Sequence, residues 1–161
     1  MRQITALWVH GTSVHEEYRD KIVQSFHKGW GSHFVGKAFT KNWFHFSIPT
    51  PALFNGVQPN LDKVFVFYNT NPREMGNSLA RITNLHIYDG PSRVKRFDGL
   101  DLQGDHSNTM DDKNSWIIDP NITIQYGLGL SVGVEYFLLP EDERSTGEIL
   151  FTTAGAVFIV E

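Results

Sequence analysis

The sequence contains no cysteine, and this absence removes several classes of site at once. A chain without thiols has no disulfide scaffold, no cysteine-ligated zinc or iron–sulfur centre and no thiol nucleophile. Long apolar runs are also missing, since no stretch approaches the roughly 20 residues of a membrane-spanning helix. A broad basic surface for nucleic acid is absent too, because 14 basic and 18 acidic residues leave a formal net charge of −4 with interspersed signs.

The first eight residues, Met1 to Trp8, lack the long apolar stretch of a signal peptide. We therefore expect a cytoplasmic protein that binds neither membranes nor nucleic acid. The 161 residues match the size of one domain, and such a chain buries roughly 70% of its unfolded surface. The length predicts a single domain over residues 1–161.

The sequence is rich in period-two alternation that is interrupted by turn residues. The longest such run is 122–136, with apolar residues at even positions, and it predicts one strand or two strands joined by a bend at glycines. Further strand candidates are 4–10, 43–48, 64–68, a hairpin over 81–97, and a strand pair or bulged strand over 147–160. Many short strands without alternating helices predict an all-β fold, a jelly-roll-like, two-sheet antiparallel β-sandwich.

Residues 14–26 could form the one short helix of the chain. Ser13 to Glu16 fits a capping box, and apolar or aromatic residues recur every four positions from Val14 to Phe26. An irregular loop followed by a strand fits the same residues. The sequence leaves the path of residues 13–33 open.

One face of the predicted sheets carries unusual side chains. If the uniformly apolar face of each strand points into the core, the opposite face has few charges and many aromatic, His and amide groups. Aromatic rings stack on apolar ligand faces, and amides and imidazoles supply directed hydrogen bonds. We therefore predict that this face binds a carbohydrate or a similar neutral polar ligand through Trp8, His10, Trp43, His45, Asn84, His86, Tyr88 and Gln125.

This prediction requires the strands that carry these residues to lie in one sheet. Two other interpretations remain open. A loop or the N-terminal segment could cover the face and make a second core, or the face could pair two copies in a homodimer, because aromatic residues are enriched at interfaces. The second interpretation makes the chain a homo-oligomeric structural or interaction protein.

An enzyme is the alternative function. A cofactor-free cyclase or isomerase of natural-product metabolism could use Glu135 as its acid and His45 or His86 as its base. The aspartates Asp98, Asp101 and Asp105 could hold calcium through oxygen ligands, although EF-hand spacing is absent. We expect no other cofactor.

Two short motifs are better explained by structure than by chemistry. Gly129 to Gly133 matches the G-x-S-x-G nucleophile elbow, but it lies inside a period-two strand and no His follows His106. His15 to Glu17 contains H-x-E, the start of a two-His-one-carboxylate iron site, but only one predicted strand precedes it. We interpret these as a strand face of small residues and a solvated loop.

Three aromatic segments carry a resemblance to known proteins. They are Ala6 to Gly11, Gly29-Trp30-Gly31 and Trp43 to Phe46. With them the chain resembles a family of uncharacterised bacterial single-domain all-β proteins, over most of its length, and this resemblance implies no functional residues. The strand pattern is also similar to carbohydrate-binding-module sandwiches and to cyclases of that fold, and fold alone does not fix function.

Overall fold

The computed structural model describes residues 2–139 and 144–161 and confirms the antiparallel β-sandwich. Within these residues the chain forms strands and two short 3-10 turns, η1 (Gly11–Ser13) and η2 (Arg19–Lys21), and no α-helix. Sheet A contains β1 (Gln3–His10), β3 (Ile22–Lys28), β4 (Gly31–Lys37), β6 (Asn60–Asn69), β9 (Asp105–His106), β10 (Ser115–Thr123) and β12 (Thr146–Val160). Sheet B contains β2 (His15–Glu16), β5 (Thr40–Ile48), β7 (Ala80–Asp89), β8 (Ser92–Phe97) and β11 (Leu128–Tyr136).

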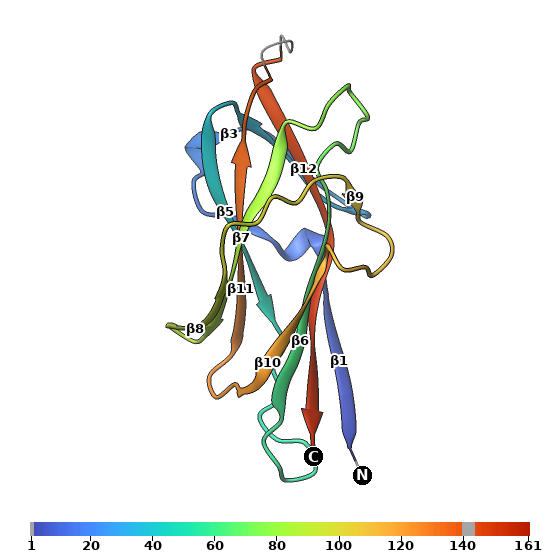
Figure 1. Cartoon of the computed structure of the whole chain (residues 1–161), viewed down its shortest axis with the longest axis vertical. Helices are drawn as coiled ribbons and strands as arrows, with labels where there is room; N and C mark the ends of the chain where they lie inside the picture. Colours follow the sequence, from blue (N-terminus) through green and yellow to red (C-terminus); the bar gives the residue numbers. More distant parts are fainter. Residues whose placement is uncertain (1, 140–143) are drawn as a thin grey trace.

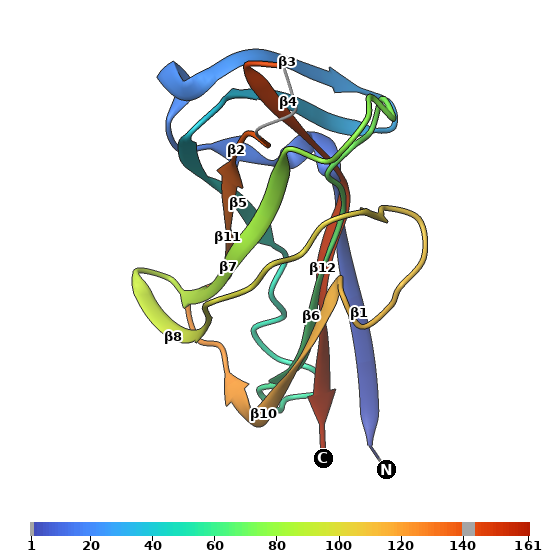
Figure 2. The ribbon, with the colours of Figure 1, turned by 45° about the horizontal axis from the view of Figure 1, so that its top comes forward.

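The two sheets differ in regularity (Figure 1). Sheet B has the simple order β2-β5-β11-β7-β8. Sheet A has the order β10-β6-β12-β4-β3, with β1 added beside β12 and β9 beside β6. Figure 2 shows β3 and β4 lying across the upper end of the molecule, because sheet A is curled. All paired strands are antiparallel, including pairs far apart in the chain such as β1 with β12 and β5 with β11.

The core lies between the sheets and is built from the apolar alternation of each strand. Phe34 of β4, Phe44 of β5 and Phe151 of β12 meet there, with ring centroids 4.7 Å (Phe34–Phe44) and 5.2 Å (Phe44–Phe151) apart. Residues 64–68 of β6 are buried without alternation, as their continuous apolar run predicts for a strand covered on both faces.

The segment 14–26 is not helical. Residues 15–16 form strand β2, and β3 begins at Ile22. The backbone of Tyr18 is fixed between them by Asn42, whose side chain accepts its N–H at 3.0 Å and donates to its carbonyl at 2.9 Å. Ile22 and Phe26 do not share a face of β3, because the register with β4 shifts between Ile22 and Gln24: Ile22 lies opposite Gly36 and packs on the core, whereas Phe26 lies opposite His33.

The run 122–136 consists of two strands with a bend, the second of the two predicted forms. β10 ends in sheet A at Thr123, and β11 begins in sheet B at Leu128, so the chain crosses between sheets at residues 124–127. The segment 147–160 belongs to one strand, β12, with irregular register near Thr153 and Phe158, so it takes the bulged-strand form of the two predicted. No helix in the described ranges has the length and apolarity to cross a bilayer.

Candidate functional site

The three central strands of sheet B place predicted site residues in aligned rows on its outer face. In one row, His45 of β5, Ser131 of β11 and His86 of β7 lie directly opposite one another. The next row towards the C-terminal end of β11 is Trp43-Gly133-Asn84, and the row on the other side is Ser47-Gly129-Tyr88. The small side chain of Ser131 lies in the middle of the first row, and in the next row Trp43 and Asn84 lie over Gly133, where a Cβ would be 3.2 Å and 3.0 Å from their nearest atoms.

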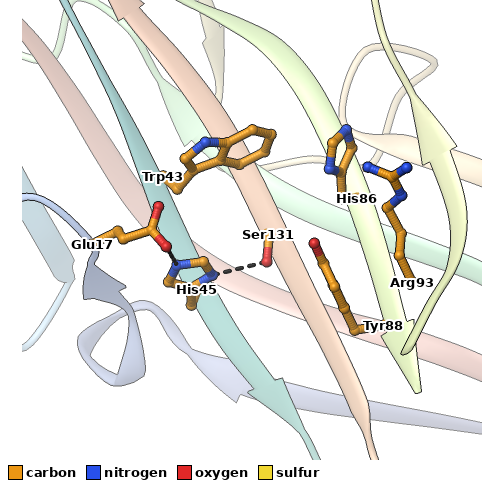
Figure 3. A pocket seen from close by; sticks show the side chains of 7 residues that line it. All are labelled: Glu17, Trp43, His45, His86, Tyr88, Arg93 and Ser131. Carbon is orange, nitrogen blue, oxygen red and sulfur yellow. Dashed lines mark hydrogen bonds and ion pairs between the residues drawn. The ribbon is translucent and has the colours of Figure 1, made fainter. Parts of the chain in front are cut away.

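A hollow of about 520 Å³ lies on this face around Ser131, and we call it the sheet B hollow (Figure 3). It is lined by Glu17, Trp43, His45, His86, Tyr88, Arg93 and Ser131. Glu17 follows the edge strand β2 and Arg93 lies on the opposite edge strand β8, so the two charged groups stand at opposite walls (Figure 3). The hollow is open, with side chains of Glu17 and His45 that are 42% and 41% exposed.

His45 connects two other residues of the hollow. Its Nδ1 lies 2.8 Å from Ser131 Oγ, and its Nε2 lies 3.6 Å from Glu17 Oε1 (Figure 3). Glu17 is fixed by its backbone, since its N–H donates to the carbonyl of Trp43 at 2.8 Å. A carboxylate beside Nε2 favours the proton on that nitrogen, and Nδ1 then accepts the hydrogen bond of the Ser131 hydroxyl.

His86 is held from the far side of the hollow. Its Nε2 lies 2.7 Å from Asp98 Oδ1, and the same oxygen accepts a hydrogen bond from Asn84 Nδ2 at 2.7 Å. The hydrogen bonds from His86 and Asn84 lower the pKa of the Asp98 carboxyl below its ordinary value. The ring of Trp43 packs against His86 with 4.8 Å between centroids. Asp98 and Asn84 therefore orient His86, and His86 supports Trp43.

Trp8 and His10 do not belong to this group, because β1 lies in sheet A. Trp8 packs on Phe65 with ring centroids 3.9 Å apart, so it covers a second apolar layer on the outside of sheet A. His10 closes the end of β1, accepting from the Thr12 N–H at 3.1 Å and contacting the Gly29 carbonyl at 3.0 Å. The assumption that all four predicted strands share one sheet is wrong for β1.

Three other predicted residues lie on or near sheet B without lining the hollow. Gln125 is in the exposed crossover between β10 and β11. Asn84 supports the hollow through Asp98. Glu135 lies on the same face, but its row pairs it with Lys41 and Arg81, and its carboxylate lies 3.3 Å from Arg81 Nη2. The structure therefore does not bring Glu135 together with His45 and His86.

The three aspartates predicted for calcium face different partners. Asp98 bonds to His86, Asp101 lies 3.6 Å from Arg81 Nη1, and Asp105 accepts from the Ser107 N–H at 3.2 Å. Across residues 2–139 and 144–161, no group of three or more His, Asp or Glu side chains is arranged to hold a metal ion. This finding covers both the aspartates and the H-x-E segment at His15.

Sequence reasoning did not place Glu17, Arg93 and Ser131 in a site. Ser131 carries a usable signal, since it is two positions from glycines on both sides within an alternating strand and so must share their face. Glu17 follows β2 and Arg93 lies on β8, at opposite edges of sheet B, and only the order of strands brings them to the same hollow.

Comparison with known families identifies the chain by family alone. The model of a family of unknown function, DUF6623, matches residues 1–155, so the chain belongs to that family. This agrees with the expected likeness to an uncharacterised single-domain family. The chain matches no curated protein.

Proposed function

We propose that this member of the DUF6623 family binds a small hydroxylated ligand, a sugar or a molecule of similar shape, in the sheet B hollow. One observation carries the proposal: aromatic rings and hydrogen-bonding groups from five strands or their flanking residues surround a single hollow. Its volume of about 520 Å³ falls in the range typical of small-molecule sites.

The lining residues supply the two kinds of contact that a sugar needs. Trp43 and Tyr88 offer flat surfaces for the apolar face of a pyranose ring. The Tyr88 hydroxyl, the Trp43 indole N–H and the Arg93 guanidinium make no hydrogen bond or ion pair within the described ranges, and all three remain available to ligand oxygens. Glu17 adds a carboxylate acceptor on the opposite wall.

The enzyme alternative based on Glu135 has less support than ligand binding. A cyclase needs its proton donor and its base on the same bound substrate. Glu135 is engaged by Arg81 outside the hollow, while His45 and His86 lie within it. A cyclase also needs a closed chamber around its substrate, whereas the side chains of Glu17 and His45 in the hollow are exposed.

The test is thermal unfolding and calorimetric titration with glucose, galactose, mannose, N-acetylglucosamine and their disaccharides. A sugar at 100 times its dissociation constant adds about 2.7 kcal/mol of stability, which corresponds to a rise in Tm of roughly 5–10 °C for a chain of this size. We expect Trp43→Ala to abolish that rise. Trp8→Ala is the matched control, because it removes an equally large ring from the outer face of the other sheet.

Two results contradict the proposal. One is the absence of any shift across the panel. The other is equal sugar affinity in the wild type and in Trp43→Ala. Light scattering on the same samples tests whether a second copy covers the hollow. A dimer that occludes it would show twice the monomer mass and no response to sugars.

A further inference from the structure

We infer that the sheet B hollow is also a catalytic site, in which Ser131 is the nucleophile for hydrolysis of a carboxylic ester and His45 is its base. The inference rests on the proposed function in one respect, since the bound hydroxylated compound is the part that carries the ester. The substrate class is therefore an O-acylated sugar or a similarly acylated polyol.

The contact between Ser131 and His45 meets the first requirement of such a site. A hydroxyl becomes a useful nucleophile when a base lies within hydrogen-bond reach, and the 2.8 Å between Ser131 Oγ and His45 Nδ1 satisfies this condition. Both side chains line the hollow, so the oxygen of Ser131 faces the space that the ligand would occupy.

Glu17 meets the second requirement, which is a group that orients the base. Its carboxylate lies 3.6 Å from His45 Nε2, on the side of the ring away from Ser131. A negative charge at this position favours the tautomer with Nε2 protonated and stabilises the imidazolium that forms when Nδ1 takes a proton. Glu17 is a positioning residue because it acts through His45.

The order of these residues along the chain is Glu17, His45, Ser131, and it does not exclude the chemistry. Catalytic triads occur in several unrelated chain orders, so a histidine upstream of the serine is acceptable. The absence of a His after His106 therefore excludes only the α/β-hydrolase arrangement. Ser131 also lies inside strand β11 and not on an elbow between a strand and a helix, as the alternation predicts.

The position of Ser131 inside a strand limits which groups can stabilise the oxyanion. The backbone N–H of Ser131 lies in the plane of the sheet between β5 and β7, so it does not point into the hollow. Stabilisation of the oxyanion must then come from side chains. The Tyr88 hydroxyl and the Arg93 guanidinium line the same hollow, and Figure 3 shows the hydroxyl end of Tyr88 turned towards the middle of the group.

The reaction proceeds in two balanced steps. Ser131 Oγ attacks the ester carbonyl carbon while its proton passes to His45 Nδ1, and the bond from that carbon to the alcohol oxygen breaks as the alcohol takes this proton. A water molecule then attacks the acyl-serine, gives one proton to His45, and releases the carboxylic acid as the proton returns to Ser131 Oγ. The net reaction consumes one ester and one water and yields one acid and one alcohol.

The experiment treats the intact chain with a fluorophosphonate probe and locates the adduct by peptide mass mapping. We expect one adduct, on Ser131, and turnover of p-nitrophenyl acetate that Ser131→Ala abolishes. His45→Gln lowers the rate by about 10²-fold or more, the usual contribution of a positioned base. Glu17→Gln lowers kcat and leaves KM unchanged. Ser47→Ala is the control, since Ser47 is an exposed serine of the same face in a neighbouring row.

The outcomes separate this inference from the proposed function. No adduct on Ser131 of the folded wild type, or an adduct of equal yield on Ser47, overturns the catalytic inference. If sugars raise Tm through Trp43 while Ser131 stays unlabelled, the binding proposal holds and the catalytic inference is rejected. If Ser131 is labelled and hydrolyses esters while no sugar binds, the catalytic site stands and the sugar proposal fails.

Discussion

Tyr136 is the residue at which close packing and hydrogen bonding conflict most clearly. Its ring lies between Gly36 and Gly147, where a Cβ would approach ring atoms to 2.2 Å and 2.9 Å respectively. The side chain is fully buried, and its hydroxyl has no hydrogen-bond partner within the described ranges. Burial raises the pKa of this hydroxyl far above its ordinary value, so the group stays neutral and unsatisfied.

We therefore expect Tyr136→Phe to stabilise the protein. The substitution keeps the ring and removes a buried polar group, and an unsatisfied group of this kind costs about 1–3 kcal/mol. A gain of about 1 kcal/mol corresponds to a rise in Tm of roughly 2–4 °C. Thermal unfolding at pH 7 measures it, and a fall in Tm of the same size would show that the hydroxyl is satisfied in solution.

The sequence predicts which residues share a strand face, but it does not predict which strands are neighbours. Trp43, His45, His86 and Tyr88 were all expected on one polar aromatic face, and all four line the sheet B hollow. Trp8 has the same alternation but lies on the other sheet. Period-two alternation shows which side of a strand is apolar, and it contains no information on which strands are neighbours.

At the scale of elements, β12 organises sheet A because it has two partners along one edge. Thr146 to Phe151 pairs with β4, and Thr153 to Val160 pairs with β1. The chain leaves β1 and later enters β4 at the same point, beside the carbonyl of Phe151. Gly11 and Gly31 lie there, and a Cβ on either would be 2.1 Å from that oxygen.

This junction predicts that alanine substitution at Gly11 costs far more stability than alanine substitution at Gly29. Gly11→Ala forces its Cβ against backbone, and we expect a loss of about 1–3 kcal/mol, as in other overpacked sites. Gly29→Ala is the control, since nothing lies within 4 Å of its Cβ position. Urea unfolding of both variants measures their free energies of unfolding. Equal values would mean that the backbone at Phe151 moves away from a Cβ at position 11 at no cost in stability.

The same scale explains why the segment 14–26 was ambiguous. Its residues fit a helix or a loop followed by a strand, and in the fold they pair with distant strands: β2 pairs with β5 and β3 pairs with β4. Asn42 of β5 also holds the backbone of Tyr18 between them. Nothing in residues 14–26 encodes these partners, so no local pattern identifies the structure that they impose.

At the scale of the whole molecule, Asp89 joins the two sheets. It ends β7 in sheet B, and its carboxylate accepts hydrogen bonds from the N–H groups of Gln125, Tyr126 and Gly127 in the crossover from sheet A. Desolvation acts to raise the pKa of Asp89, but these three backbone hydrogen bonds outweigh it and lower the pKa below its ordinary value.

A lowered carboxyl pKa makes part of the fold's stability dependent on pH. The ionised form of Asp89 contributes fully above the pKa of an unfolded aspartate, about 3.9, and the contribution is lost as the pH falls further towards the folded pKa. The unfolded state binds the proton first in that window, so acid weakens the connection between the sheets.

Asp89→Asn tests this connection, because asparagine keeps the shape and removes the charge. We expect the variant to lose about 1.5–3 kcal/mol at pH 7, the range for hydrogen bonds to charged groups. The difference in the free energy of unfolding between the variant and the wild type should stay constant from pH 7 to about 5 and then narrow towards pH 3. Urea unfolding at each pH gives both quantities, and the other carboxylates cancel because they titrate in both proteins. A difference that is unchanged at pH 3 would show that the three N–H groups are held by geometry alone and that the charge of Asp89 does not join the sheets.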